Sequence, residues 1–155
     1  AVERLPRGLR HRLILELLET TAMDDASLVI DTLRRCRDLG VEVSLDDFGT
    51  GYSSLDYFRK LPAHEIKIDR SFVNDMLDDP ESEMVVTAIL GLARSFGRRV
   101  VAEGIENAET HARLIELGCD LGQGFYYAKP MPYQQAYEWA ANFHWQTVAV
   151  TAVDS

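Results

Sequence analysis

Features that would place this sequence outside ordinary globular proteins are scarce. The 155 residues include two cysteines, Cys36 and Cys119, which are too few for a disulfide framework and lack the paired spacing of a zinc site. No apolar run approaches the roughly 20 residues needed to cross a bilayer, and no basic segment followed by an apolar one opens the chain. We therefore expect a cytosolic location, with membrane attachment left open for any longer parent protein.

Basic residues are also in short supply. Lysine and arginine number 16 against 25 aspartates and glutamates, which gives a formal net charge of −9. A protein that binds DNA or RNA polymers without regard to sequence normally shows a basic surface, so this class is disfavoured. An anionic substrate would be repelled by this charge unless positive charge were present at the site. Divalent cations held by carboxylates supply that positive charge. The alternative is that the acidity serves only solubility.

The residues that are present alternate between short β-rich apolar runs and longer amphipathic stretches. This alternation predicts a βα fold with one hydrophobic core. The expected strands are 13–18, 41–46, 65–68, 100–102 and 121–125. The expected helices are 26–39, a short one ending near 61, 83–96, 108–117 and 133–143. We assign residues 1–146 to one domain and 147–155 to a C-terminal tail.

About five βα units with parallel strands fit either an open doubly wound sheet or part of a (β/α)8 TIM-like barrel. The polar residues in or after the predicted strands favour the barrel. They are Glu16, Asp46 with Asp47, Lys67, Glu103 and Gln123. The carboxyl ends of barrel strands converge on one mouth, where the active sites of this architecture lie. One ionisable or amide group at each of five successive strands is difficult to explain by chance.

Asp46 and Asp47 form the most informative pair. Two adjacent carboxylates at a strand end repel each other and are costly to bury without a cation. Hard divalent ions prefer oxygen ligands, and the glycines that follow in the loop allow a ligand to approach closely. A helix cap or a solvated turn is the alternative interpretation of this pair when it is considered alone.

Four segments, the first of which begins with Asp46 and Asp47, are informative together. They are DDFGTGYSSL (46–55), KIDRSFV (67–73), VVAEGIE (100–106) and GCDLGQGFYYAKP (118–130), preceded by ELLE (16–19). In order and spacing this set resembles the signature motifs of the EAL family of cyclic di-GMP phosphodiesterases. The family has a TIM-like barrel fold, and it hydrolyses the bacterial messenger cyclic di-GMP to linear pGpG with two metal ions.

The resemblance implies a role for each matching residue. Glu16, Asp46, Asp47 and Glu103 would hold two Mg²⁺ or Mn²⁺ ions, with Glu103 acting directly or through water. Lys67 would lie near the attacking water and Gln123 would orient water or substrate, so Lys67, Glu103 and Gln123 are the expected catalytic residues. Glu106 would anchor the loop 47–54. Gln123 and Pro130 are expected to contact substrate, since flat apolar surfaces suit a guanine base.

Simpler interpretations exist for each residue taken singly. Lys67 alone would be an ordinary surface lysine, and Gln123 alone would satisfy a backbone group. We interpret Glu19, the second glutamate of ELLE, as a structural hydrogen-bonding residue. The four histidines show no paired spacing, and we assign them no catalytic role.

The Glu-Ala-Leu motif itself and a strand with a metal-binding asparagine are not found in the sequence. We therefore expect the chain to be the C-terminal portion of an EAL domain and to be inactive alone. It would be completed by a missing N-terminal part or by self-association as a homo-oligomer. GGDEF or sensory domains are expected in the parent protein. A catalytically inactive cyclic di-GMP receptor or scaffold is the main alternative, and an unrelated metabolic barrel is a weaker one.

Overall fold

A computed structural model describes residues 10, 12–19, 26–50 and 55–143. It contains one sheet of five parallel strands in the order β1-β2-β3-β4-β5. The strands are β1 (Ile14–Leu18), β2 (Glu42–Phe48), β3 (Glu65–Ile68), β4 (Arg99–Ala102) and β5 (Leu121–Gly122). The helices are α2 (Ala26–Asp38), α3 (Leu55–Lys60), α4 (Arg70–Asp75), α5 (Pro80–Ser95), α6 (Ala108–Glu116) and α7 (Tyr133–Asn142).

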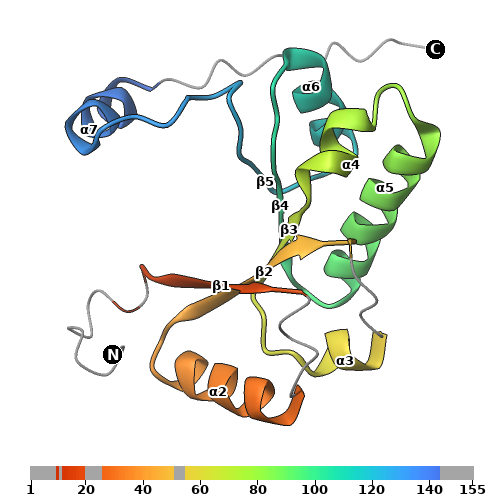
Figure 1. Ribbon diagram of the computed structural model, residues 1–155, viewed down its shortest axis with the longest axis vertical. Coiled ribbons are helices and arrows are strands. Elements are labelled where there is room, and N and C mark those ends of the chain that lie inside the picture. The colour runs from red at the N-terminus through yellow and green to blue at the C-terminus, as the bar shows by residue number, and fades with distance from the viewer. Residues whose placement is uncertain (1–9, 11, 20–25, 51–54, 144–155) are drawn as a thin grey trace.

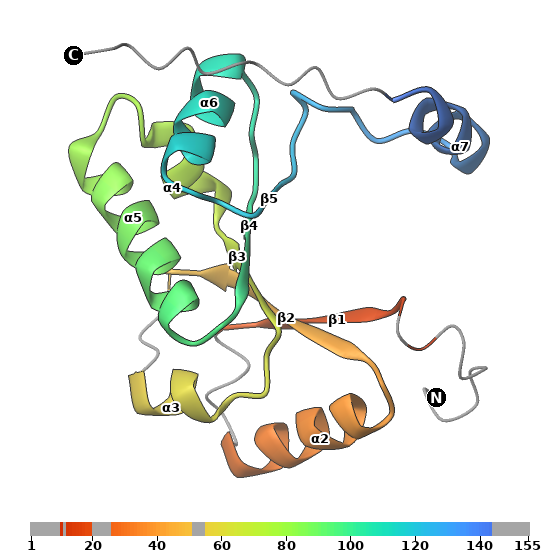
Figure 2. The same ribbon diagram turned by 180° about the vertical axis from the view of Figure 1, so that it is seen from behind.

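The order of the strands confirms the barrel-type interpretation of the sequence. Each strand pairs with the next one along the chain, and the order never reverses as it does in a doubly wound sheet. Helices α2 to α6 follow the strands along one side of the sheet, whereas α7 stands apart from them on the other side (Figures 1 and 2). The described part of the chain is therefore an arc of a (β/α) barrel.

The two faces of the sheet differ in chemistry because side chains alternate along each strand. One face of β2 and β3 carries Val43, Leu45, Ile66 and Ile68, which are at most 1% exposed and pack in the main hydrophobic core. The opposite face carries polar residues. These are Glu42, Ser44 and Asp46 on β2, and Glu65 and Lys67 on β3. We call this second face the site face.

Local sequence signals explain where the helices begin and end. Asp79 accepts hydrogen bonds from the backbone N–H groups of Glu81 and Ser82, and Pro80 follows it as the first residue of α5. Asn107 caps α6 in the same way through the N–H of Thr110. Gly97 and Gly118 follow α5 and α6 with φ of 64° and 78°, in the left-handed conformation that stops a helix.

Three elements differ from the sequence prediction by more than two residues. The six-residue α4 was not predicted, although Asp69 is a capping residue at its start and accepts from the N–H of Ser71. Helix α5 begins at Pro80 rather than at residue 83. Strand β5 has two residues rather than five, because the chain turns away at Gly124. The proposed tail, 147–155, lies outside the described residues. Within the described residues, no helix is long and apolar enough to span a membrane.

Candidate metal and catalytic site

The polar residues predicted from successive strands meet at the carboxyl ends of β1 to β4. The ammonium group of Lys67 lies at the centre, and the Lys67 side chain is 8% exposed. It donates to Glu103 at 2.7 Å, Asp46 at 3.0 Å and Glu16 at 3.1 Å. Each carboxylate comes from a different strand or from the residue directly after one. The site is therefore assembled across the sheet and requires the parallel register of all four strands.

The backbone at Asp47 explains how two adjacent aspartates reach the same site. Successive residues in a regular strand point to opposite faces, so Asp47 would face the helices if β2 were regular. The register between β2 and β3 instead shifts between Leu45 and Phe48, and Asp47 has a φ of 55°. This irregularity turns Asp47 to the site face and returns Phe48 to the core, where it is 8% exposed. A left-handed aspartate could not have been predicted from the sequence.

The carboxylates crowd one another. Asp46, Asp47 and Glu103 each offer an oxygen, and these oxygens lie within 4.8 Å of one another. Burial raises the pKa of Asp47, and the negative charges of Asp46 and Asp69 raise it further. Burial likewise raises the pKa of Glu103, although the hydrogen bond from Lys67 partly opposes the effect. Burial lowers the pKa of Lys67, but its hydrogen bonds to Glu103, Asp46 and Glu16 outweigh this, and the net shift is upward.

This donor set fits divalent cations. Four carboxylates and one ammonium leave an excess of negative charge, because Lys67 is the one cation that pairs with this cluster among the described residues. Three clustered carboxylates are the oxygen ligands that Mg²⁺ and Mn²⁺ prefer. Glu16 is connected to the cluster through Lys67 and is more exposed than Asp46 and Glu103.

The loop that follows Asp47 is held by Glu19. The side chain of Glu19 is buried, and its Oε2 accepts a hydrogen bond of 3.1 Å from the N–H of Gly49. The N–H of Glu19 in turn donates to the carbonyl of Asp46 at 3.1 Å. The structural role predicted for Glu19 thus acts on this loop. Glu106 is the residue predicted to anchor the same loop, and its side chain is exposed. Because residues 51–54 of the loop lie outside the described part of the chain, the anchoring role of Glu106 stays a prediction.

Gln123 and Pro130 line one cavity of about 870 Å³ between β5 and α7. Gln123 follows β5 directly, its N–H donates to the carbonyl of Ala102, and its own carbonyl accepts from the N–H of Ile105. It is therefore fixed next to the turn that carries Glu103. The cavity wall also includes Phe125, Tyr127, Lys129 and Trp139, so aromatic and cationic groups surround the two residues predicted to contact substrate.

Fold and site together define a barrel-type α/β protein with a cluster of acidic residues around a lysine towards the carboxyl ends of its strands. The model of the EAL domain family matches residues 2–130. The chain therefore belongs to the EAL domain family. It is 46% identical over 132 residues to the bifunctional diguanylate cyclase/cyclic di-GMP phosphodiesterase MucR of Pseudomonas aeruginosa, an alignment that covers 82% of this chain and 19% of MucR.

Solved structures of the family share the fold. The phosphodiesterase PaMucR in complex with c-di-GMP superposes with a TM-score of 0.80 at 45% identity, covering 82% of this chain and 51% of that one. The manganese/cy-diGMP complex of Klebsiella pneumoniae BlrP1 superposes with a TM-score of 0.73 at 31% identity, covering 79% of this chain and 32% of that one. The chain thus spans about a fifth of the length of MucR and about half of the solved PaMucR chain.

Proposed function

We propose that the protein containing this chain hydrolyses cyclic di-GMP to linear pGpG in a reaction that depends on Mg²⁺ or Mn²⁺. The observation that carries the proposal is the convergence of Glu16, Asp46 and Glu103 on Lys67, with Asp47 beside them. The cyclic di-GMP and manganese complexes of its relatives support the same substrate and cofactor.

Each residue of the site has its own proposed role in the reaction. Glu16, Asp46, Asp47 and Glu103 would hold two divalent ions. Ions bound there would neutralise the phosphoryl oxygens and lower the pKa of a bound water. Lys67 donates hydrogen bonds to the carboxylates on three sides, which keeps them in place. Its positive charge would lie near the attacking water. Glu103 would hold an ion directly or through water, and in that position it would help to orient the attacking water.

The cavity beside β5 is the proposed place of a guanine base. Gln123 would orient the phosphodiester, because its backbone is hydrogen-bonded on both sides to the segment around Glu103. Pro130 offers a flat apolar surface for the purine. The aromatic residues Phe125 and Tyr127, which line the same cavity, are further stacking candidates.

The test is the activity of the full-length protein and of its Asp46→Asn and Asp47→Asn variants. Production of pGpG, followed by chromatography in Mg²⁺ and in Mn²⁺, is expected to fall at least about 100-fold in each variant, because charge stabilisation in the transition state is lost. Circular dichroism is expected to show a retained fold. Asp38→Asn, at the exposed end of α2, is the matched control. Near-normal turnover in either site variant would refute the metal assignment.

A receptor is the alternative function. It would bind cyclic di-GMP in an equilibrium assay while the unmodified protein produced no pGpG in either metal.

We further propose that the site acts in the cytosol. Because the chain spans a small part of its relatives and one of these is a bifunctional diguanylate cyclase/phosphodiesterase, we propose that GGDEF or sensory domains accompany it.

A further inference from the structure

Arg98 is a buried cation without a carboxylate partner among the described residues. It precedes β4 and is 9% exposed. Its Nη2 donates two hydrogen bonds of 2.7 Å, one to the carbonyl of Phe58 and one to that of Leu61. Its guanidinium carbon lies 4.1 Å from the centre of the Phe58 ring, while Nη1 is buried with no hydrogen-bond partner in the described structure. Arg98 therefore contacts both the carbonyl groups at the end of α3 and the ring of Phe58, and it holds them in place.

Burying a guanidinium in this way is expensive. An arginine removed from water without an anionic partner loses hydration that two carbonyls and an aromatic ring replace only in part. The burial lowers the pKa of Arg98. A leucine would avoid that cost but would leave the carbonyls of Phe58 and Leu61 without these two hydrogen bonds. The arginine is thus better suited to fixing one arrangement of α3 than to maximising stability.

A short chain of contacts connects Arg98 to the metal site. The ring of Phe58 lies 5.2 Å from that of Phe48, and both side chains are buried. Phe48 directly follows Asp47, the residue held at a φ of 55°. Because Phe48 enters the core only if the backbone turns at Asp47, any loosening of the Phe48 site relaxes that turn. Packed side chains transmit such shifts since interiors have little free volume.

We propose that Arg98 is a positioning residue for the turn at Asp46 and Asp47. Its guanidinium fixes α3 and Phe58, Phe58 holds Phe48 in the core, and Phe48 holds Asp47 on the site face. The effect of Arg98 on the order of the backbone at Asp46 and Asp47 is independent of the function proposed above. The effect of Arg98 on metal binding rests on that function.

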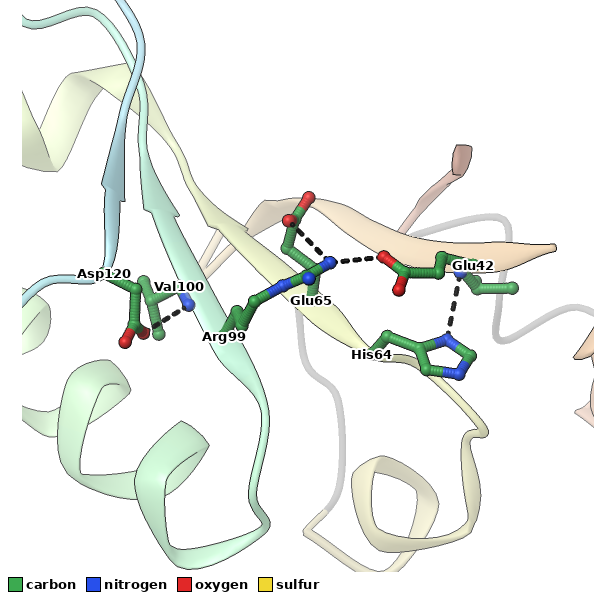
Figure 3. A network of polar contacts seen from close by, with 7 residues as sticks. Glu42, His64, Glu65, Arg99, Val100 and Asp120 are labelled. Carbon is green, nitrogen blue, oxygen red and sulfur yellow. Dashed lines mark hydrogen bonds and ion pairs between the residues drawn. The ribbon is translucent and has the colours of Figure 1, made fainter. Parts of the chain in front are cut away.

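The adjacent Arg99 provides a matched control. Figure 3 shows the Arg99 side chain extending from β4 across the site face towards Glu65 and Glu42. It pairs with Glu42 and lies 3.5 Å from Glu65. This network joins β2, β3 and β4 at their amino ends, opposite the metal site. Loss of Arg99 therefore removes an arginine and its cross-strand contacts without touching Phe58 or Phe48.

The experiment compares hydrogen–deuterium exchange in the 155-residue chain and in its Arg98→Leu, Arg98→Lys and Arg99→Leu variants. In Arg98→Leu, exchange of the backbone amides of residues 47–50 is expected to rise about tenfold, which is within the usual range of coupling between contacting residues. Arg98→Lys keeps a cation for the carbonyls but lacks the flat guanidinium over Phe58, so an intermediate rise is expected. Arg99→Leu is expected to leave these amides at the parent rate.

Binding of Mn²⁺ alone by the full-length protein and by the same variants made in it, measured by calorimetry, is the second readout. Affinity is expected to fall about tenfold in Arg98→Leu and to stay at the parent value in Arg99→Leu. Parent exchange rates at residues 47–50 in Arg98→Leu, or an equal rise in Arg99→Leu, would overturn the proposal. If Arg98→Leu does not fold, the same comparison between Arg98→Lys and Arg99→Leu decides. If the unmodified full-length protein binds no Mn²⁺, the proposed function fails, whereas the exchange comparison still judges the role of Arg98.

Discussion

At the scale of single residues, Lys67 dominates the electrostatics of the site. It is the one cation among the described residues that pairs with Glu16, Asp46 and Glu103, and its side chain is 8% exposed. A strand-end lysine considered alone would be assigned to the surface. The sequence identified it only as a member of an ordered set, because motif spacing indicates which residues converge but not how deeply each one is buried. In the protein without metal, the positive charge of Lys67 reduces the repulsion among the clustered carboxylates and so lowers the free-energy cost of burying them.

Lys67→Met is therefore expected to destabilise the metal-free chain by about 2 kcal/mol. This is less than the usual cost of breaking a fully buried ion pair, because Glu16 reaches solvent. Saturating Mg²⁺ or Mn²⁺ is expected to restore part of the loss by neutralising the same carboxylates. Urea unfolding with and without metal measures both effects. Lys60→Met, which removes an exposed helix lysine paired with Asp56, is the control. Equal losses with and without metal would contradict this account.

Glu103 makes stability depend on pH in a defined direction. Its pKa is raised in the folded chain, mainly by burial, so the folded state binds its proton more tightly than the unfolded state does. The free energy of unfolding of the metal-free chain should therefore fall as pH rises, from the ordinary glutamate pKa of about 4.3 up to the raised value. Glu103→Gln removes this contribution, so its urea midpoint is expected to decline less over that window. An identical decline in both proteins would show that Glu103 is not its source.

At the scale of elements, the sequence predicted what depends on repeated pattern and missed what depends on close packing. The alternation of apolar runs located each of the five strands, and glycines marked the ends of α5 and α6. The turn at Asp47 and the short β5 were not predictable, because both depend on contacts between distant segments. Gly124, which follows β5, is an example of such a contact, because a Cβ atom on it would lie 2.1 Å from the carbonyl oxygen of Ile105. Only a residue without a side chain allows this approach.

Gly124→Ala is accordingly expected to push the segment after β5 away from Ile105. Gln123 directly precedes Gly124, so it should move with the segment, and its hydrogen bonds to the carbonyl of Ala102 and to the N–H of Ile105 should be strained or lost. We expect a loss of about 1–3 kcal/mol in stability and a clear fall in activity of the full-length protein. Gly91→Ala is the matched control, since a Cβ at this exposed helical position meets nothing within 4 Å; it should stabilise the chain by up to about 1 kcal/mol. Unchanged activity in Gly124→Ala would argue against a role for the position of Gln123.

At the scale of the whole molecule, the two sides of the sheet are unequally covered. The helix side is packed, whereas β1 presents alternate residues to solvent on the site face. Ile14 is 43% exposed and Leu18 is 47% exposed, and both share the face of Glu16, which reaches Lys67. Helix α7 adds Tyr137 at 68% and Trp139 at 38%. Exposed apolar groups on one side of a protein are a usual basis for association.

The 155-residue chain is therefore expected to self-associate as its concentration rises. Size-exclusion chromatography with light scattering should give a mass above the 17.5 kDa of one chain, shifting towards that value on dilution. Ile14→Thr combined with Leu18→Thr should reduce association while keeping β1, since threonine favours strands and is less apolar. The same double change at Leu28 and Met84, which are exposed on α2 and α5, is the control and should leave the mass unchanged. A single species of 17.5 kDa at every concentration, or equal effects of the two double variants, would show that the site face of β1 does not drive association.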